Sequence, residues 1–265
     1  MLLSFQEAGM PRKALKNKPL VEAIYELKWE LEQRGEGIFI DPHYKLLIGS
    51  LYSQVKADYP YHEMLPTASI PDEAAGHVIQ HRFRKGENEW PLIQIGPGIL
   101  TVNETEAYIW ENFEAKIRQA MTAFLAAHPE PLKLGINSLL LRYIDAVEFD
   151  YSEQNIFEFL SRQMKTEIRP YPKLFESTEV DSAPASFDWR FSYPCRKPVG
   201  MIHMRFVRGK RQDKDALIWE TMVQSMNMKT SPTVETIAAW LSAAHDLTDD
   251  WFFKLIEGEL ERRFS

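Results

Sequence analysis

Cysteine is almost absent from this chain. Its 265 residues include one cysteine, Cys195, which cannot form a disulfide within the chain. A small disulfide-stapled fold is thereby excluded, and a reducing cytoplasm is the compartment that this cysteine usage predicts.

Long hydrophobic runs are absent as well. The longest apolar stretch, residues 136–147, is interrupted by Arg142 and Asp145. It falls short of the ~18 consecutive apolar residues that would span a bilayer. The first residues, Met1 to Glu7, lack the basic segment and the long apolar stretch of a secretory signal. We therefore predict a cytoplasmic protein with no membrane contact.

Charge is present in both signs, with an acidic excess. The chain has 38 acidic and 31 basic residues, a net charge of -7, and 45% apolar residues. This composition is that of an ordinary globular protein and excludes collagen, coiled coil and wholesale disorder. The acidic total repels nucleic acid and anionic membranes, although a local basic patch could still bind either one.

The first half of the chain predicts a strand, a helix, three strands and a second helix. Apolar residues at alternate positions from Val21 to Leu31 are typical of a half-buried strand. Asp41 is expected to cap the first helix, with Pro42 at its first position and its end near Tyr59. The remaining predicted elements are strands over 77–84, 90–95 and 99–103 and a helix over 108–127.

The second half repeats that order. Its predicted elements are a strand over 136–149, a helix over 155–164 and strands over 187–193, 199–208 and 216–224. Residues 169–185 are expected to form an irregular loop and residues 209–214 a turn. The last helix should begin with Ser231 as its cap and Pro232 at its first position, and continue to the C-terminus with a break near Asp249 and Asp250.

This order of elements predicts an α+β fold with antiparallel strands and helices packed on one face of the sheet. Residues 19–134 and 135–265 form two similar β-α-β-β-β-α halves in this interpretation, after an N-terminal arm over residues 1–18 that is loose or simply frayed. We expect one continuous curved sheet, because only a brief loop separates the halves. Two separate lobes are the alternative.

Four segments occur in an order that resembles a known family. They are Lys18-Pro19-Leu20-Val21-Glu22-Ala23-Ile24, Trp90-Pro91-Leu92-Ile93-Gln94-Ile95-Gly96-Pro97-Gly98, Leu141-Arg142-Tyr143-Ile144-Asp145 and the helix from Trp240 to Phe252. With these segments the chain, from about Pro19 to its end, resembles a sporadically distributed, functionally uncharacterised family of bacterial and archaeal proteins. The resemblance implies a prokaryotic cytoplasmic protein and carries over no activity, cofactor or site residue.

Candidate catalytic residues are few, and no complete catalytic motif is present. Asp145 shares a strand face with apolar residues, so it should be buried and should need a partner, while Arg142 points to the opposite face. For Asp145 a structural ion pair or a hydrogen-bonded carboxylate is preferred over a catalytic role. His245 and Asp249 have the spacing of a hydrogen-bonded pair on a helix, as in base catalysis, but a structural histidine near the helix break is the preferred interpretation. With His203, these give the candidates Arg142, Asp145, His203 and His245.

Metal and cofactor signatures are missing. His77 and His81 would lie on one face of a strand, about 13 Å apart, too far to share a metal ion. The segment Gly96-Pro97-Gly98 is followed by another strand and not by a helix, so it predicts a hairpin turn and not a phosphate loop. We predict neither a metal nor a cofactor.

Basic residues cluster on one predicted hairpin. They are Arg205, Arg208, Lys210 and Arg211, with Lys214 nearby. Such a cluster is the best nucleic-acid footprint in the chain. Asp213 and Asp215 dilute it, and an ordinary solvated hairpin is the alternative.

Three functions remain open from the sequence. The first is a non-enzymatic interaction protein, such as an antitoxin, immunity factor or accessory subunit of a prokaryotic system, with a protein partner or a second copy of itself on mixed-charge sheet faces. The second is an enzyme or small-ligand binder with a cleft between the halves. The third is nucleic-acid binding through the 205–214 hairpin. The first is preferred, because catalytic motifs are missing and the total charge is acidic.

Overall fold

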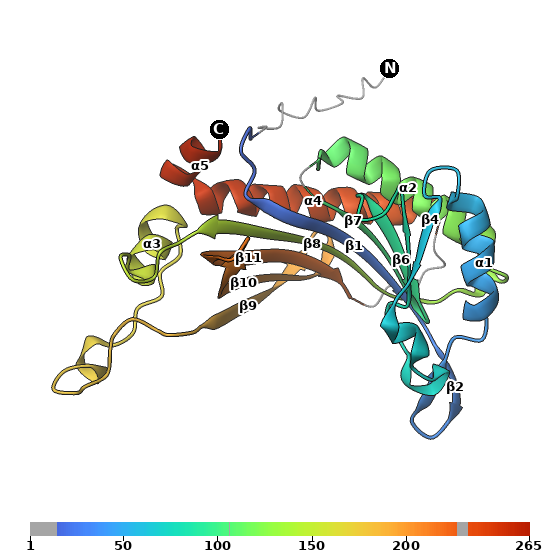
Figure 1. Ribbon diagram of the computed structural model, residues 1–265, viewed down its shortest axis with the longest axis horizontal. Helices are drawn as coiled ribbons and strands as arrows, with labels where there is room; N and C mark the ends of the chain where they lie inside the picture. Colours follow the sequence, from blue (N-terminus) through green and yellow to red (C-terminus); the bar gives the residue numbers. More distant parts are fainter. Residues whose placement is uncertain (1–14, 106, 227–232) are drawn as a thin grey trace, which may run out of the picture.

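One antiparallel sheet organises the molecule, and a two-stranded hairpin is attached to it (Figure 1). The computed structural model describes residues 15–105, 107–226 and 233–265. In spatial order the nine strands of the sheet are β4 (Tyr61–Met64), β5 (His81–Arg84), β6 (Leu92–Gly96), β7 (Ile99–Glu104), β1 (Leu20–Trp29), β8 (Ile136–Glu148), β11 (Lys214–Ser225), β10 (Val199–Arg211) and β9 (Asp188–Arg196). The hairpin pairs β2 (Glu32–Gly35) with β3 (Ile38–Ile40).

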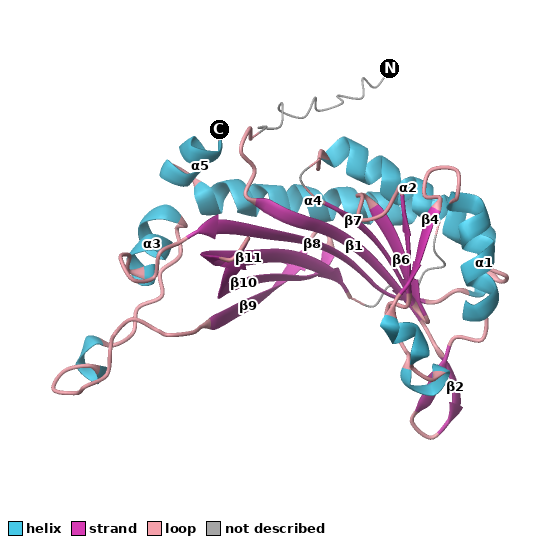
Figure 2. Cartoon of the chain, in the orientation of Figure 1, coloured by secondary structure: helices cyan, strands magenta, loops and turns pink. Residues whose placement is uncertain are grey.

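Helices pack against one face of this sheet (Figure 2). They are α1 (Tyr44–Val55), α2 (Trp110–Ala127), α3 (Ile156–Gln163), α4 (Val234–Ile256) and α5 (Glu259–Phe264). Helix α2 contacts both α1 and α4, and α4 also lies against β8 and β11. The predicted α+β class, with helices on one face, is confirmed.

The sheet is continuous through its centre. β1 and β8 are antiparallel neighbours, with Leu27 opposite Leu139 and Ile24 opposite Arg142. The expectation of one continuous sheet is therefore confirmed. The equivalence of residues 19–134 and 135–265 as two halves stays a prediction.

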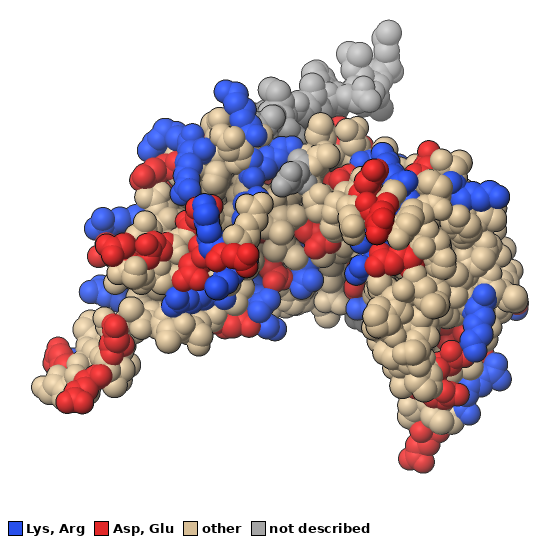
Figure 3. Space-filling view, viewed as in Figure 1, with Lys and Arg blue, Asp and Glu red and all other residues tan. Residues whose placement is uncertain are grey.

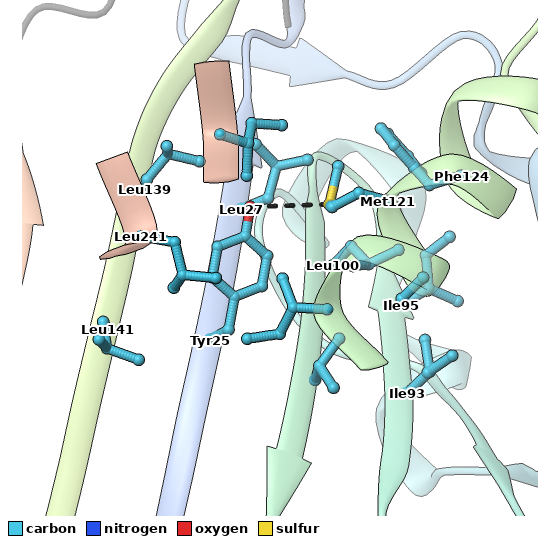
Figure 4. Close-up of a cluster of buried hydrophobic side chains, with 14 of the residues drawn as sticks. Tyr25, Leu27, Ile93, Ile95, Leu100, Met121, Phe124, Leu139, Leu141 and Leu241 are labelled. Atoms are coloured by element: carbon cyan, nitrogen blue, oxygen red, sulfur yellow. Dashed lines mark hydrogen bonds between the residues drawn. The ribbon is translucent and has the colours of Figure 1, made fainter. Parts of the chain in front are cut away.

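Alternation along the strands separates a core face from a polar face. On β1 the side chains of Ala23, Tyr25 and Leu27 are fully buried, while the residues between them are partly exposed. The hydroxyl of Tyr25 contacts the sulfur of Met121 on α2 at 3.6 Å (Figure 4). Period-two burial of this kind is what a strand with one covered face requires.

The core has two parts. The larger cluster lies between the sheet and α1, α2 and the first half of α4. In the smaller cluster, α3, α5 and the last turns of α4 pack against Val147 of β8, Phe206 of β10 and Leu217 of β11. Helix α4 contributes to both clusters, so it bridges the two parts of the core.

Helix α1 begins later than the sequence predicts. Its first residue is Tyr44 and its N-cap position is His43, so the assignment of Asp41 as the cap is wrong. The Asp41 carboxylate instead accepts hydrogen bonds from the indole of Trp29 at 2.9 Å, the amide of Gly98 at 3.1 Å and the amide of His43 at 3.0 Å. Donors from three different segments satisfy this carboxylate, which ties the start of α1 to the sheet.

Several predicted boundaries also shift. The strand expected over 77–84 begins at His81, because His77 adopts a positive φ of 60° in a turn. The short edge strand β4 (Tyr61–Met64) was not predicted from the sequence. The turn expected over 209–214 is only two residues long, since Gln212 and Asp213 both have positive φ and the strands pair up to them. The hairpin turn at Gly96-Pro97-Gly98 is confirmed between β6 and β7.

Helix α4 is unbroken. It passes through Asp249 and Asp250 without interruption, so the predicted break there is wrong. The chain breaks instead at Gly258, whose φ of 107° separates α4 from α5. Thr233 and Thr236 form the capping box at its start, and the predicted cap at residues 231–232 lies outside the described residues.

The end of the predicted N-terminal arm is anchored. The amide of Asn17 donates to the carbonyl of Phe264 at 2.9 Å, and Leu15 packs against the smaller core cluster. Lys18 donates to the carbonyl of Tyr108. Residues 15–18 are thus part of the fold, and the rest of the predicted arm lies outside the described residues. In the described part of the chain, no helix combines the length and the apolar character needed to cross a membrane.

Candidate functional site

A pocket of about 730 Å³ lies between α4 and the sheet, where the two core clusters meet. Its walls come from the chain before β1, the start of α2, the strands β8 and β11, and the middle of α4. The lining residues are Leu15, Lys18, Pro19, Leu20, Tyr108, Ile109, Trp110, Glu111, Tyr143, Asp145, Thr221, His245, Thr248, Asp249, Phe252 and Phe253. This volume is typical of pockets that hold small organic ligands, which range over about 300–1,000 Å³.

A chain of hydrogen bonds crosses the pocket wall. The hydroxyls of Tyr108 and Tyr143 are 2.9 Å apart, and the Tyr143 hydroxyl is 3.0 Å from Nδ1 of His245. The His245 ring also stacks on the indole of Trp110, with ring centroids 3.7 Å apart and planes within 13°. Burial and the neighbouring Tyr108 raise the pKa of Tyr143 well above its usual value, so this hydroxyl stays protonated and can donate.

Asp145 is the most unusual group in the pocket. Its side chain is 2% exposed, and its Oδ2 atom has no hydrogen-bond partner among the described residues. It follows Tyr143 on the same face of β8, between Leu20 of β1 and Trp219 of β11. Burial among these side chains raises the pKa of Asp145 to about 8, against a smaller opposing effect of Arg211. A buried carboxyl that lacks a partner is costly, so a partner from outside the chain would stabilise it.

Carboxyl groups outnumber cations around the pocket. Glu111, Asp145 and Asp249 line it, against Lys18 and the titratable ring of His245. The Lys18 ammonium is already engaged, because it donates to the carbonyl of Tyr108 and lies 5.9 Å from the centroid of that ring.

The structure divides the four candidate catalytic residues between two faces of the sheet. Asp145 and His245 both line the pocket. Arg142 lies on the opposite face, where it pairs with Glu220 at 3.0 Å. His203 lies on that opposite face too, and its Nδ1 is 2.7 Å from the hydroxyl of Ser192. Nδ1 of His245 is 3.0 Å from the Tyr143 hydroxyl, which β8 presents to α4, and the pairing of His245 with Asp249 stays a prediction.

The uncovered face of the sheet carries a polar ladder. Its members alternate along their strands with core residues and hydrogen-bond or pair across neighbouring strands: Glu63, Arg82, Gln94, Thr101, Asn103 and Glu22, then Arg142, Glu220, Arg205, Asp188 and Arg190. The mixed-charge surface anticipated from the sequence is thus assembled, with its charges neutralised by each other. Figure 3 shows charges of both signs on the surface and a hollow on the lower side of the molecule.

The basic hairpin is held by contacts within the chain. Arg205 pairs with Asp188 and Glu220, at 2.8 and 2.7 Å. Arg208 pairs with Asp215 at 3.0 Å and lies 4.1 Å from the ring centroid of Tyr151. Arg211 donates to the carbonyl of Ala146 at 3.2 Å, and Lys210 is exposed. A nucleic-acid phosphate would have to compete with carboxylates for two of these three guanidinium groups.

Histidines do not assemble a metal site in the described chain. His77 contacts the backbone carbonyl of Trp29 at 3.1 Å, while His81 is paired with His62 at 2.9 Å. No cluster of three or more potential metal-ligating side chains occurs among the residues that the structure describes.

Sequence reasoning missed the tyrosines and the lysine of the pocket. Tyr143 could have been predicted as a neighbour of Asp145, because it lies two residues before it and on the same face of the strand. Tyr108 and Lys18 carry no such signal, since they reach the pocket only through contacts with residues far along the chain.

Comparisons with known proteins return no match. The chain matches no family model, no curated protein and no solved structure.

Proposed function

We propose that this protein binds a small organic ligand in the pocket between α4 and the sheet. The observation that carries this proposal is the Asp145 carboxyl, which is 2% exposed and has no partner for its Oδ2 among the described residues, in the wall of a pocket of about 730 Å³. A pocket that is largely apolar with a few convergent polar groups is the usual form of a ligand site. Tyr143 and His245 supply those further polar groups.

Variants whose larger side chains fill the pocket test the proposal. Thr221→Met adds volume at a buried lining position, and Ile109→Trp adds bulk at a position that is 50% exposed on the rim. We expect compounds found by a thermal-shift screen of metabolite-sized molecules to lose affinity for both variants and to retain it for Leu46→Trp, at an exposed site on α1. Compounds that bind all three variants equally, or a screen in which nothing binds, would contradict the proposal.

A second candidate is a protein partner on the uncovered sheet face. It is the function preferred from the sequence, and one observation favours it: Ile24, Ile144 and Met222 are partly exposed among the paired charges of neighbouring central strands. Apolar contact area surrounded by polar groups of both signs is typical of protein interfaces. Patterned charges of this kind select a folded protein over a polyanion.

This candidate makes its own prediction. A tagged chain expressed in its native host should co-purify with a defined protein at a fixed stoichiometry. Ile144→Arg on the uncovered face should abolish that complex, whereas Leu46→Arg on α1 should preserve it, because Leu46 is already 70% exposed on the other side of the sheet. Loss of the complex in both variants, or in neither, would argue against this face.

A further inference from the structure

The residues that line the pocket indicate the chemical class of its ligand. This inference rests on the proposed ligand-binding function. We propose that the pocket binds an organic amine, whose protonated nitrogen pairs with the Asp145 carboxylate and whose apolar or aromatic body lies against Trp110 and Phe252. Each part of this assignment follows from a different feature of the site.

The position of Asp145 fixes the polar end of the ligand. Its carboxyl lines the pocket, is 2% exposed and leaves Oδ2 without a hydrogen-bond partner among the described residues. A carboxylate accepts hydrogen bonds and donates none, so the group that best satisfies it is a cationic N–H donor. Arg211 influences this carboxyl, but its guanidinium donates to the carbonyl of Ala146.

The other charges of the pocket favour a cation over an anion. Glu111 and Asp249 line the same pocket as Asp145, and the ammonium of Lys18 is bonded to the carbonyl of Tyr108. An anionic ligand would lie against the Asp145 carboxyl, whereas a cationic ligand would pair with its ionised form.

Aromatic walls fix the body of the ligand. Trp110 is stacked on His245, and Phe252 and Phe253 contact each other edge to face with ring centroids 5.3 Å apart. All four line the pocket. Aromatic rings bury apolar surface and attract a cation to their faces, so both halves of an aryl- or alkylamine are accommodated.

Binding should be linked to a proton. Burial raises the pKa of Asp145 to about 8, so this carboxyl is mostly neutral at pH 7. An ammonium ion that pairs with it favours the ionised form, and the proton leaves for solvent. Affinity for an amine should therefore rise with pH up to about 8 and then level off, which an uncharged ligand would not show.

Matched probes test the assignment. Isothermal titration calorimetry at pH 8 compares 2-phenylethylamine and tryptamine with their alcohol and carboxylate counterparts. We expect the amines to bind about tenfold or more tightly than the alcohols, because a charge-assisted hydrogen bond contributes more than a neutral one. In buffers of different ionisation enthalpy at pH 7, each amine should release close to one proton.

Variants separate this inference from the proposed function. Asp145→Asn keeps the shape of the side chain and should reduce amine affinity about tenfold, to the level of the alcohols. A cooperative melting transition by circular dichroism shows that the variant folds, and the pH profile of the native chain gives an independent readout if it does not. Glu179→Gln, at an exposed position in the 169–185 loop, is the matched control.

Two results would overturn the amine assignment alone. Alcohols or carboxylates that bind as tightly as the amines, and lose affinity in Thr221→Met, would leave the pocket as a ligand site and reject the cation. Amine affinity that survives Asp145→Asn would do the same. If no probe of any class binds and the wider screen is also empty, the proposed function itself fails.

Discussion

The hydroxyl of Tyr143 lies 3.0 Å from Nδ1 of His245, across the junction between β8 and α4. These residues are 102 positions apart in the chain, and their contact joins a central strand to the longest helix. The same hydroxyl is 2.9 Å from that of Tyr108, so one side chain connects three segments. Because Asp145 follows on the same face of β8, this link also sets the shape of the pocket around the carboxyl.

Removal of the Tyr143 hydroxyl should destabilise the fold. Tyr143→Phe removes two partly buried hydrogen bonds, and we expect a loss of about 1–3 kcal/mol in the free energy of unfolding. Urea titration followed by fluorescence measures this change. Tyr193→Phe is the control, because Tyr193 is 46% exposed and its ring packs against Trp251 on the surface. Equal stability of the two variants would show that the chain of bonds contributes little.

Asp145 should make the native state less stable as the pH rises. Its folded pKa of about 8 lies above the ordinary aspartate pKa of 3.8, so the folded state holds a proton that the unfolded state releases between these limits. The free energy of unfolding therefore falls with increasing pH in that window, by at most about 1.4 kcal/mol per unit from this group. Stability below pH 4 is unaffected, and the loss is complete above pH 8.

Asp145→Asn isolates that pH effect. The variant should lack the downward slope, so it should be more stable than the native chain by a few kcal/mol at pH 8.5 and similar to it near pH 4. Urea unfolding at several pH values provides the comparison, with Glu179→Gln as the surface control. A native chain whose stability rises from pH 5 to 8 relative to the asparagine variant would contradict the expected sign.

A second buried carboxylate depends on a partner within the chain. The side chain of Glu104 is 1% exposed and pairs with Lys116 of α2 at 2.5 Å. Lys116→Met leaves that carboxylate buried without its cation and should cost about 3 kcal/mol. Glu104→Gln combined with Lys116→Met should recover much of the loss, and chemical denaturation of the single and double variants measures the coupling. If the stability losses of the two single variants add in the double variant, the two side chains are not coupled.

The basic hairpin should contribute little to any affinity of this protein for nucleic acid. Arg208→Ala, Lys210→Ala and Arg211→Ala together should leave the affinity for DNA or RNA unchanged in fluorescence anisotropy at low salt. The reason is that Arg208 and Arg211 are bonded to Asp215 and to a backbone carbonyl. A tenfold weaker binding by the triple variant would instead support the hairpin as a phosphate-binding site.

Local patterns predicted the elements better than their ends. The alternation on β1 and the spacing of Phe113, Ile117 and Met121 on α2 gave the right element types, because period two and period 3.6 are local properties of the backbone. The start of α1 was misplaced because Asp41 resembles a cap in sequence. In the fold its carboxylate is bonded to Trp29 and Gly98, which no local pattern reveals.

The candidate site shows the same division. Burial of Asp145 followed from its apolar neighbours on one strand face, and the separation of Arg142 onto the opposite face followed from strand geometry. The grouping of Asp145 with His245 was only one of several possible arrangements of the candidates. The structure selects it because α4 crosses the sheet over β8.

The sequence by itself determined the α+β class, the two faces of each strand and the burial of Asp145, since side-chain alternation and hydrophobic periodicity depend on neighbours along the chain. Only the tertiary structure decided that β1 and β8 meet at the centre of one sheet and that α4 bridges two core clusters. The pocket exists where those clusters fail to close against each other. Tyr108, Tyr143 and His245 come together there because packing joins segments that the sequence keeps far apart.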